Sequence, residues 1–158
     1  MSKLFACLFD LQMRLAARQL NPRRQSVASG ASGRILEVGI GTAQNAPFYP
    51  PGARVIGVDP EPAMLARARR RAHDAPAAID LAAAAGEALP FRDGTFDSAV
   101  ITLVLCSVDS QENALREVHR VLKPGGHLHF LEHVRSEAPG WARVQDALTP
   151  VCKRVAGG

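Results

Sequence analysis

The sequence has few cysteines. It contains three, Cys7, Cys106 and Cys152, which lie far apart and form no CxxC pair. An odd and widely spaced set argues against a disulfide framework and against a structural zinc site, and it favours a reducing compartment. We therefore expect a cytoplasmic protein.

The sequence also lacks any apolar run near the roughly twenty residues that span a bilayer. Its N-terminus shows no small-residue cleavage site after an apolar core. The body of the chain is not basic either: the formal net charge is +4, but residues 1–34 carry six basic side chains against one acidic one. We expect no membrane-spanning helix, no secretory signal and no nucleic-acid partner.

What is present begins with an amphipathic pattern. Residues 2–20 place leucines at helical spacing on one stripe, with most of the charged side chains away from it. Asn21-Pro22 should end this helix, and the small, polar stretch 26–33 should be a linker. Residues 1–33 are thus expected to precede a domain at 34–158.

Two interpretations of the N-terminal helix stay open. It could pack over the domain as an ordinary covering helix. Alternatively, its basic amphipathic character suits peripheral contact with an anionic membrane through residues 2–20, or a lid over the active site.

One stretch organises the rest of the chain. Residues 35–38 are apolar apart from Glu37 and predict a short buried strand, which runs into two glycines, Gly39 and Gly41, ahead of a helical segment. In α/β proteins such a strand, turn and helix bring backbone N–H groups against a nucleotide-like ligand. Glycine suits the turn because it adopts positive φ and has no Cβ to hold the ligand away.

Further strand-like segments alternate with helical ones. The expected strands are 34–38, 54–58, 78–83, 96–104 and 127–134. The expected helices after the first glycine turn are 43–48, 61–74, 111–122 and 141–155. This alternation predicts an α/β, Rossmann-like, doubly wound, mostly parallel sheet with helices on both faces. The polar residues that follow the strands can then converge at one edge of the sheet.

Asp59 follows the second expected strand, 18 residues after Gly41. A carboxylate in this place can accept two hydrogen bonds from a ribose diol. The plainer alternative is a helix N-cap ahead of Pro60. The strand–glycine–helix context favours ribose binding.

The charges near the turn favour one of two cofactors. A dinucleotide site needs a third glycine where this chain has Gln44, and Glu37 would repel a pyrophosphate. Glu37, Asp59 and Glu87 would instead form an acidic pocket that suits the cationic amino and sulfonium groups of S-adenosylmethionine. An NAD-dependent oxidoreductase is correspondingly disfavoured.

Four segments resemble, in order and spacing, the motifs of class I S-adenosylmethionine-dependent methyltransferases: ILEVGIGTA, VIGVDP, GEALPFRDGTFDSAV and LREVHRVLKPGGHLHFLEHV. They cover about residues 34–135. The segments NAPFYPPG, TLVLCSV and FLEHV are similar to the thiol methyltransferase (methyltransferase-like seven) group and its small bacterial relatives, with ubiquinone/menaquinone-type methyltransferases as more distant kin. The resemblance implies the class I methyltransferase fold, S-adenosylmethionine as the cofactor and a small molecule as the methyl acceptor.

The resemblance also implies a set of site residues. The methionine part of the cofactor would be lined by Glu37, Gly39, Gly41 and Thr42, and the ribose hydroxyls would be bound by Asp59. The adenine would be flanked by Pro60 and Met64 and contacted at its edge by Gly86, Glu87 and Ala88. Leu103 would lie beside the methyl donor. Two positions depart from the family pattern. Ala43 replaces the third glycine of GxGxG, which narrows the turn, and Ala85 replaces an aspartate that reads the adenine amino group.

The largest departure from the family lies at the end of the chain. The family's sheet has two more strands, in an antiparallel hairpin, whereas residues 141–158 have room for a helix only. The fifth strand would then be an unpaired edge, which is an association hazard. We expect either a truncated chain or a homodimer that covers this edge.

A general base is needed only if the acceptor must lose a proton. The candidates are His133 and Glu132, which strand alternation sends to opposite faces, and the alternative is that this pair stabilises the strand end. Cys106 is expected to be a small apolar wall rather than a nucleophile. His127 and His129 share a strand face, but no third ligand accompanies them, so we expect no metal site.

Two classes of function therefore remain. The first is an S-adenosylmethionine-dependent methyltransferase whose acceptor is a small apolar thiol, quinone or lipid-like compound, which the apolar N-terminal helix would suit. The second is a non-catalytic S-adenosylmethionine-binding or interaction module, or a fragment of a methyltransferase. Turnover with an acceptor separates the two classes.

Overall fold

The computed structural model describes residues 3–132 and 134. Its elements along the chain are α1 (Lys3–Ser29), β1 (Arg34–Val38), the 3-10 helix η1 (Ala46–Phe48), β2 (Arg54–Val58), α2 (Pro62–His73), β3 (Ala78–Ala82), β4 (Phe96–Thr102), α3 (Gln111–Val121) and β5 (Leu122–Leu131). The strands form one parallel sheet in the order β3-β2-β1-β4-β5. The expected α/β, Rossmann-like class is confirmed.

The winding of the sheet reverses beside β1. Strands β2 and β3 lie on one side of β1, and β4 and β5 lie on the other. Val38 at the end of β1 is in register with Val58 of β2 and Ile101 of β4, so these three strands end close to the same level. In open α/β sheets a ligand binds outside the strand C-termini at such a switch point.

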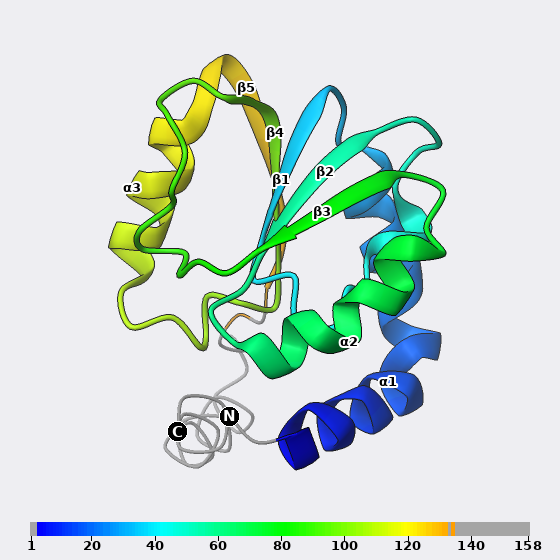
Figure 1. Ribbon diagram of the computed structural model, residues 1–158. Coiled ribbons are helices and arrows are strands. Elements are labelled where there is room, and N and C mark those ends of the chain that lie inside the picture. Colours follow the sequence, from blue (N-terminus) through cyan, green and yellow to red (C-terminus); the bar gives the residue numbers. More distant parts are fainter. Residues whose placement is uncertain (1–2, 133, 135–158) are drawn as a thin grey trace.

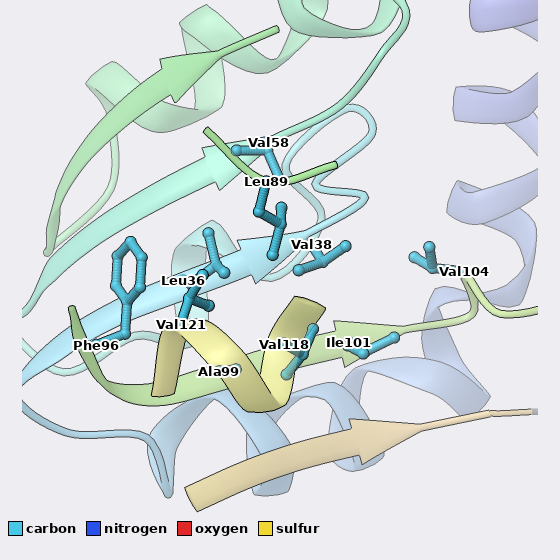
Figure 2. Packing of buried hydrophobic residues seen from close by; sticks show 10 residues of the cluster. All are labelled: Leu36, Val38, Val58, Leu89, Phe96, Ala99, Ile101, Val104, Val118 and Val121. Carbon is cyan, nitrogen blue, oxygen red and sulfur yellow. The ribbon is translucent and has the colours of Figure 1, made fainter. Parts of the chain in front are cut away.

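Helices cover both faces of the sheet, as Figure 1 shows: α3 lies on one face, and α1 and α2 lie on the other. Side chains of β1 alternate between the two layers. Leu36 and Val38 pack in a cluster with Val118 and Val121 of α3 (Figure 2). Ile35 instead packs with Ala28 and Ala31 under the end of α1. Glu37 has the same parity as Ile35, so its side chain enters the layer that α1 covers.

The core under α1 and α2 is built largely from small side chains. One cluster contains Ala28, Ala31, Ile35, Tyr49, Val55, Ala77 and Val100. Another contains Ile40, Ala43, Ala46, Leu65 and Ala68 below α2. Small residues at these positions let the end of α1 and the glycine turn approach the sheet closely.

The N-terminal helix is longer than its sequence predicts. The expected stop at Pro22 is wrong, because α1 continues through Pro22 to Ser29 and replaces the first half of the expected linker. A proline inside a helix lacks an N–H and displaces nearby carbonyls. Here Arg23 Nη1 donates to the Gln19 carbonyl oxygen at 3.3 Å, in the turn around Pro22. None of the helices in the described part of the chain combines the length and apolar character needed to cross a bilayer.

Other boundaries differ by smaller amounts. The expected helix at 43–48 is a series of turns that ends in the short η1. Strand β5 begins at Leu122 rather than residue 127, because Leu122 already pairs with Phe96 of β4. The register then shifts, and His127 pairs with Ser98. The helix expected at 141–155 lies outside the described residues.

Candidate functional site

The chain leaves β1 through a turn that requires glycine. Gly39 and Gly41 have φ angles of 65° and 56°, in the left-handed region that residues with a Cβ rarely adopt. A Cβ on Gly39 would collide with the side chain of Val104. Among the described residues, a Cβ on Gly41 would meet only the Gly39 carbonyl oxygen, at 3.9 Å, so the backbone of Gly41 borders open space where a ligand can approach.

The turn accommodates Ala43 at the position where the resembled family has glycine. Ala43 has a φ of 59° and is fully buried among the small residues below α2. The left-handed conformation costs about 1–2 kcal/mol for a residue with a Cβ, while burying a methyl group gains about 0.8 kcal/mol. These opposing effects are of similar size, so the alanine leaves the turn intact.

Asp59 is tied directly to the glycine turn. The Gly41 N–H donates to Asp59 Oδ2 at 3.0 Å, and the Glu61 N–H donates to Oδ1 at 2.9 Å. The helix N-cap is Glu61 rather than Asp59. Burial raises the pKa of Asp59, and the two backbone hydrogen bonds oppose this rise. Each carboxylate oxygen accepts one bond and keeps capacity for another, which is what a ribose diol needs.

A buried polar network lies beside the turn. Glu37 Oε1 accepts from Asn45 Nδ2 at 2.8 Å, and Oε2 accepts from the Tyr49 hydroxyl at 2.9 Å. Asn45 Nδ2 also donates to Thr102 Oγ1 at 2.9 Å. Asn45 Oδ1 accepts from Arg24 Nη1 at 3.0 Å. The network therefore joins α1, β1, the loop before η1 and β4 at the switch point of the sheet.

Burial governs the protonation of this network. The loss of water raises the pKa of Glu37 to about 7, although hydrogen bonds from Tyr49 and Asn45 and the positive charge of Arg24 lower it. Burial also raises the pKa of the Tyr49 hydroxyl well above its usual value, so Tyr49 remains a neutral donor. Glu37 is then partly ionised at neutral pH, and a cation placed beside it would complete its ionisation.

Sequence reasoning found Glu37 but missed its partners. Asn45 and the single tyrosine, Tyr49, belong to the NAPFYPPG segment, whose polar residues in an otherwise apolar context were an available signal. Thr102 ends a strand in which the three preceding residues, 99–101, are apolar. Arg24 gave no signal, because it is one of several arginines in the N-terminal segment.

The loop after β3 lies on the other side of the turn. Gly86 packs against the end of β1, where a Cβ would approach Val38 Cγ1 to 3.0 Å. Glu87 Oε1 accepts from the N–H groups of Asp109 and Ser110 at 2.8 and 3.3 Å. Glu87 therefore anchors the start of α3 with one oxygen, in addition to the ligand role that the resemblance implies.

The segment after β4 is held in an uncommon conformation. Leu103 has a φ of 58° and donates its N–H to the Leu131 carbonyl oxygen at 2.8 Å. Glu132 Oε1 accepts from the N–H groups of Val104 and Leu105 at 2.7 and 3.0 Å. Residues with a Cβ in left-handed geometry cluster at functional sites. The clamp by Glu132 supports the interpretation that it stabilises the strand end.

The remaining predicted site residues are placed as follows. Thr42 is buried, and its carbonyl oxygen accepts from Arg71 Nη1 at 2.7 Å. Met64 is buried in α2, Pro60 and Ala88 are exposed, and His133 lies outside the described residues. Among the described residues, no three histidine, cysteine or acidic side chains gather in a way that could hold a metal ion.

The arrangement is suited to a ligand that contains both a diol and a cation. The open space at Gly41, the acceptor capacity of Asp59 and the partly ionised Glu37 lie around one turn. A carboxylate accepts strong hydrogen bonds from hydroxyls. It also attracts a cation strongly where little water screens the two charges. These residues fit S-adenosylmethionine better than a pyrophosphate.

Comparison with known proteins gives a consistent result. Residues 36–130 match a family model described as a methyltransferase domain. The chain is 42% identical over 147 residues to thiol S-methyltransferase TMT1A of Homo sapiens, across 87% of this chain and 58% of that protein. It is 39% identical over 132 residues to demethylmenaquinone methyltransferase of Thermus thermophilus, across 78% of this chain and 60% of that protein. The aligned region thus spans a little more than half the length of these curated relatives.

Solved structures share the fold. An S-adenosylmethionine-dependent methyltransferase of Thermotoga maritima, named as a possible histamine N-methyltransferase, is 26% identical with a TM-score of 0.71, across 92% of this chain and 66% of its own. The [4+2]-cyclase SpnF is 29% identical with a TM-score of 0.65, across 80% of this chain and 48% of its own.

Proposed function

The chain belongs to the methyltransferase-domain family, and from this premise we propose that it transfers a methyl group from S-adenosylmethionine to a small apolar acceptor, with thiols as the first class to test. The observation that carries the proposal is the link between Asp59 and the Gly41 N–H beside open space. The similarity to thiol S-methyltransferase TMT1A supports the choice of acceptor class.

Each part of the cofactor has a candidate partner in this chain. Asp59 would bind the ribose hydroxyls, Gly39 and Gly41 would let the backbone approach, and Glu37 would attract the positive charge. The cofactor supplies the reactive methyl group as a sulfonium. The chain then has to hold the acceptor in line with that methyl group and exclude water.

A thiol acceptor reacts as its thiolate, so a base or a lowered thiol pKa is required. Glu132 is engaged by two backbone N–H groups. The proposal of a general base therefore rests mainly on His133. Leu103, at the end of β4, remains the proposed neighbour of the reacting methyl group.

The proposal extends to where the protein acts. A cytoplasmic protein that contacts an anionic membrane through residues 2–20 would meet an apolar acceptor where such compounds collect. A homodimer over β5 would cover a strand that carries Phe130, whose side chain is 62% exposed.

A second function has one observation in its favour. The neighbour SpnF is named for a cyclisation, which shows that a fold of this kind is not restricted to proteins named for methyl transfer. The chain could in that case bind S-adenosylmethionine without transferring its methyl group. Binding without turnover would support this alternative.

The proposal is tested by calorimetric titration of the purified chain with S-adenosylhomocysteine, with NAD as the control ligand. We expect a Kd on the order of micromolar, equivalent to about −8 kcal/mol, and no NAD binding. A panel of thiol, quinol and amine acceptors with labelled S-adenosylmethionine then tests turnover. A folded chain that does not bind S-adenosylhomocysteine would overturn the proposal.

Cofactor binding should strengthen as pH rises. The pKa of Glu37 is about 7 in the free protein, and the ammonium group that S-adenosylhomocysteine shares with the cofactor favours the ionised carboxylate, so binding releases a proton. The affinity for S-adenosylhomocysteine should therefore rise about tenfold from pH 6 to pH 8 and then level off.

Titration in buffers of different ionisation enthalpy measures the released proton directly. Glu37→Gln should remove the pH dependence between pH 6 and 8. Glu112→Gln is the matched control, because its carboxylate is exposed on α3. Equal slopes for the Glu37 variant and the wild type would contradict this assignment.

A further inference from the structure

The N-terminal helix places a buried cation beside the candidate cofactor site. Arg24 is 5% exposed, although arginine rarely lies so deep without a specific partner. It shares a helix face with the fully buried Ala28, one turn further along. Arg24 also precedes the region 36–130 that the family model covers. The family resemblance therefore assigns it no role.

The bond from Arg24 decides which way the Asn45 amide faces. A guanidinium can only donate, so Asn45 must turn its carbonyl oxygen toward Arg24. The amide NH2 group then points toward Glu37 and Thr102, to which it donates at 2.8 and 2.9 Å. The opposite orientation would set NH2 against the guanidinium and the amide oxygen against the carboxylate.

We infer that Arg24 is a positioning residue of the cofactor site, which orients Asn45 and adds positive charge so that Glu37 is presented as an ionised acceptor. The inference rests on the proposed function, because it assigns Glu37 to the positively charged amino group that S-adenosylmethionine and S-adenosylhomocysteine share. It also makes α1 a part of the site rather than only a covering helix.

The polar groups that the described residues place around Glu37 come from α1, the chain around η1 and β4. Arg24 enters from α1, Tyr49 and Asn45 from the chain around η1, and Thr102 from β4. Tyr49 remains a neutral donor, and Asn45 and Thr102 are uncharged. The positive charge of Arg24 lowers the pKa of Glu37 against the effect of burial. Removing this charge should therefore shift the ionisation of Glu37 to higher pH.

The test is titration of variants of the 158-residue chain with S-adenosylhomocysteine from pH 6 to pH 9. Arg24→Gln should bind about fivefold more weakly at pH 7, with the midpoint of the pH profile raised by about one unit and the deficit shrinking toward pH 9. Arg24→Lys should recover part of the affinity, because it keeps the charge. Arg23→Gln is the matched control, since Arg23 is the adjacent arginine and is exposed.

Each outcome separates this inference from the proposed function. Failure of the wild type to bind overturns the proposed function. Wild-type binding together with an unshifted Arg24→Gln profile, or with a loss that is equal at every pH, overturns the role of Arg24 and leaves the proposed function standing.

A second measurement needs no variant and decides the matter if the Arg24 variants do not fold. Hydrogen exchange of the wild type should show slower exchange in residues 24–29 when S-adenosylhomocysteine is bound, because coupling between helix and site is reciprocal. Slower exchange confined to the glycine turn would overturn the inference.

Discussion

Replacing Gly39 by alanine should destabilise the fold by about 2–5 kcal/mol, through the left-handed backbone and the crowding of a buried side chain. Gly39 has a φ of 65°, and the new Cβ would lie 2.5 Å from Val104 Cγ2. Many domains have only about 5–15 kcal/mol of stability in total. Urea unfolding followed by circular dichroism measures the loss, and cofactor binding should fall with it.

Two comparisons separate strain from crowding in this prediction. Gly52 also has positive φ, at 81°, but no atom in the part of the chain that the structure describes lies within 4 Å of a Cβ built there. Gly52→Ala should therefore cost only the backbone strain, about 1–2 kcal/mol. Adding Val104→Ala to Gly39→Ala should recover part of the difference. Equal losses for the Gly39 and Gly52 variants would contradict the crowding argument.

The turn and Asp59 could be predicted from the sequence because their signals are local. A short apolar strand, two glycines and a carboxylate after the next strand depend on periodicity and on the backbone needs of a turn. Because parallel strands end at one edge, the sheet topology brings Asp59 to the Gly41 N–H without further information.

The network around Glu37 could not be predicted in the same way. It joins Arg24 to Asn45 across 21 residues and Asn45 to Thr102 across 57, so it is complete only after the sheet has assembled and α1 has docked on it. The helix end that the sequence predicts at Pro22 is also wrong. A local rule places a helix end before a proline, but tertiary packing of Arg24 and Ala28 holds the following turns against the sheet.

Replacing Asp59 by asparagine should weaken S-adenosylhomocysteine binding by about 100-fold or more, because hydrogen bonds to a charged group contribute about 1.5–3 kcal/mol each. Asparagine has one acceptor oxygen, while the Gly41 and Glu61 N–H groups already need two. The side-chain NH2 would face one of these donors. Calorimetric titration measures the effect, and Asp80→Asn, at an exposed position of β3, is the matched control.

A loss of affinity alone does not show that Asp59 contacts the ribose, because a distorted turn would also weaken binding. The 2′-deoxy analogue of S-adenosylhomocysteine removes one of the hydroxyls that Asp59 is proposed to bind. If the contact is direct, the analogue should bind the wild type more weakly than S-adenosylhomocysteine does. For Asp59→Asn, the difference in affinity between the two ligands should be much smaller. Full additivity of the two losses would mean that Asp59 acts through the Gly41 turn, and the ribose would then be bound elsewhere on the site.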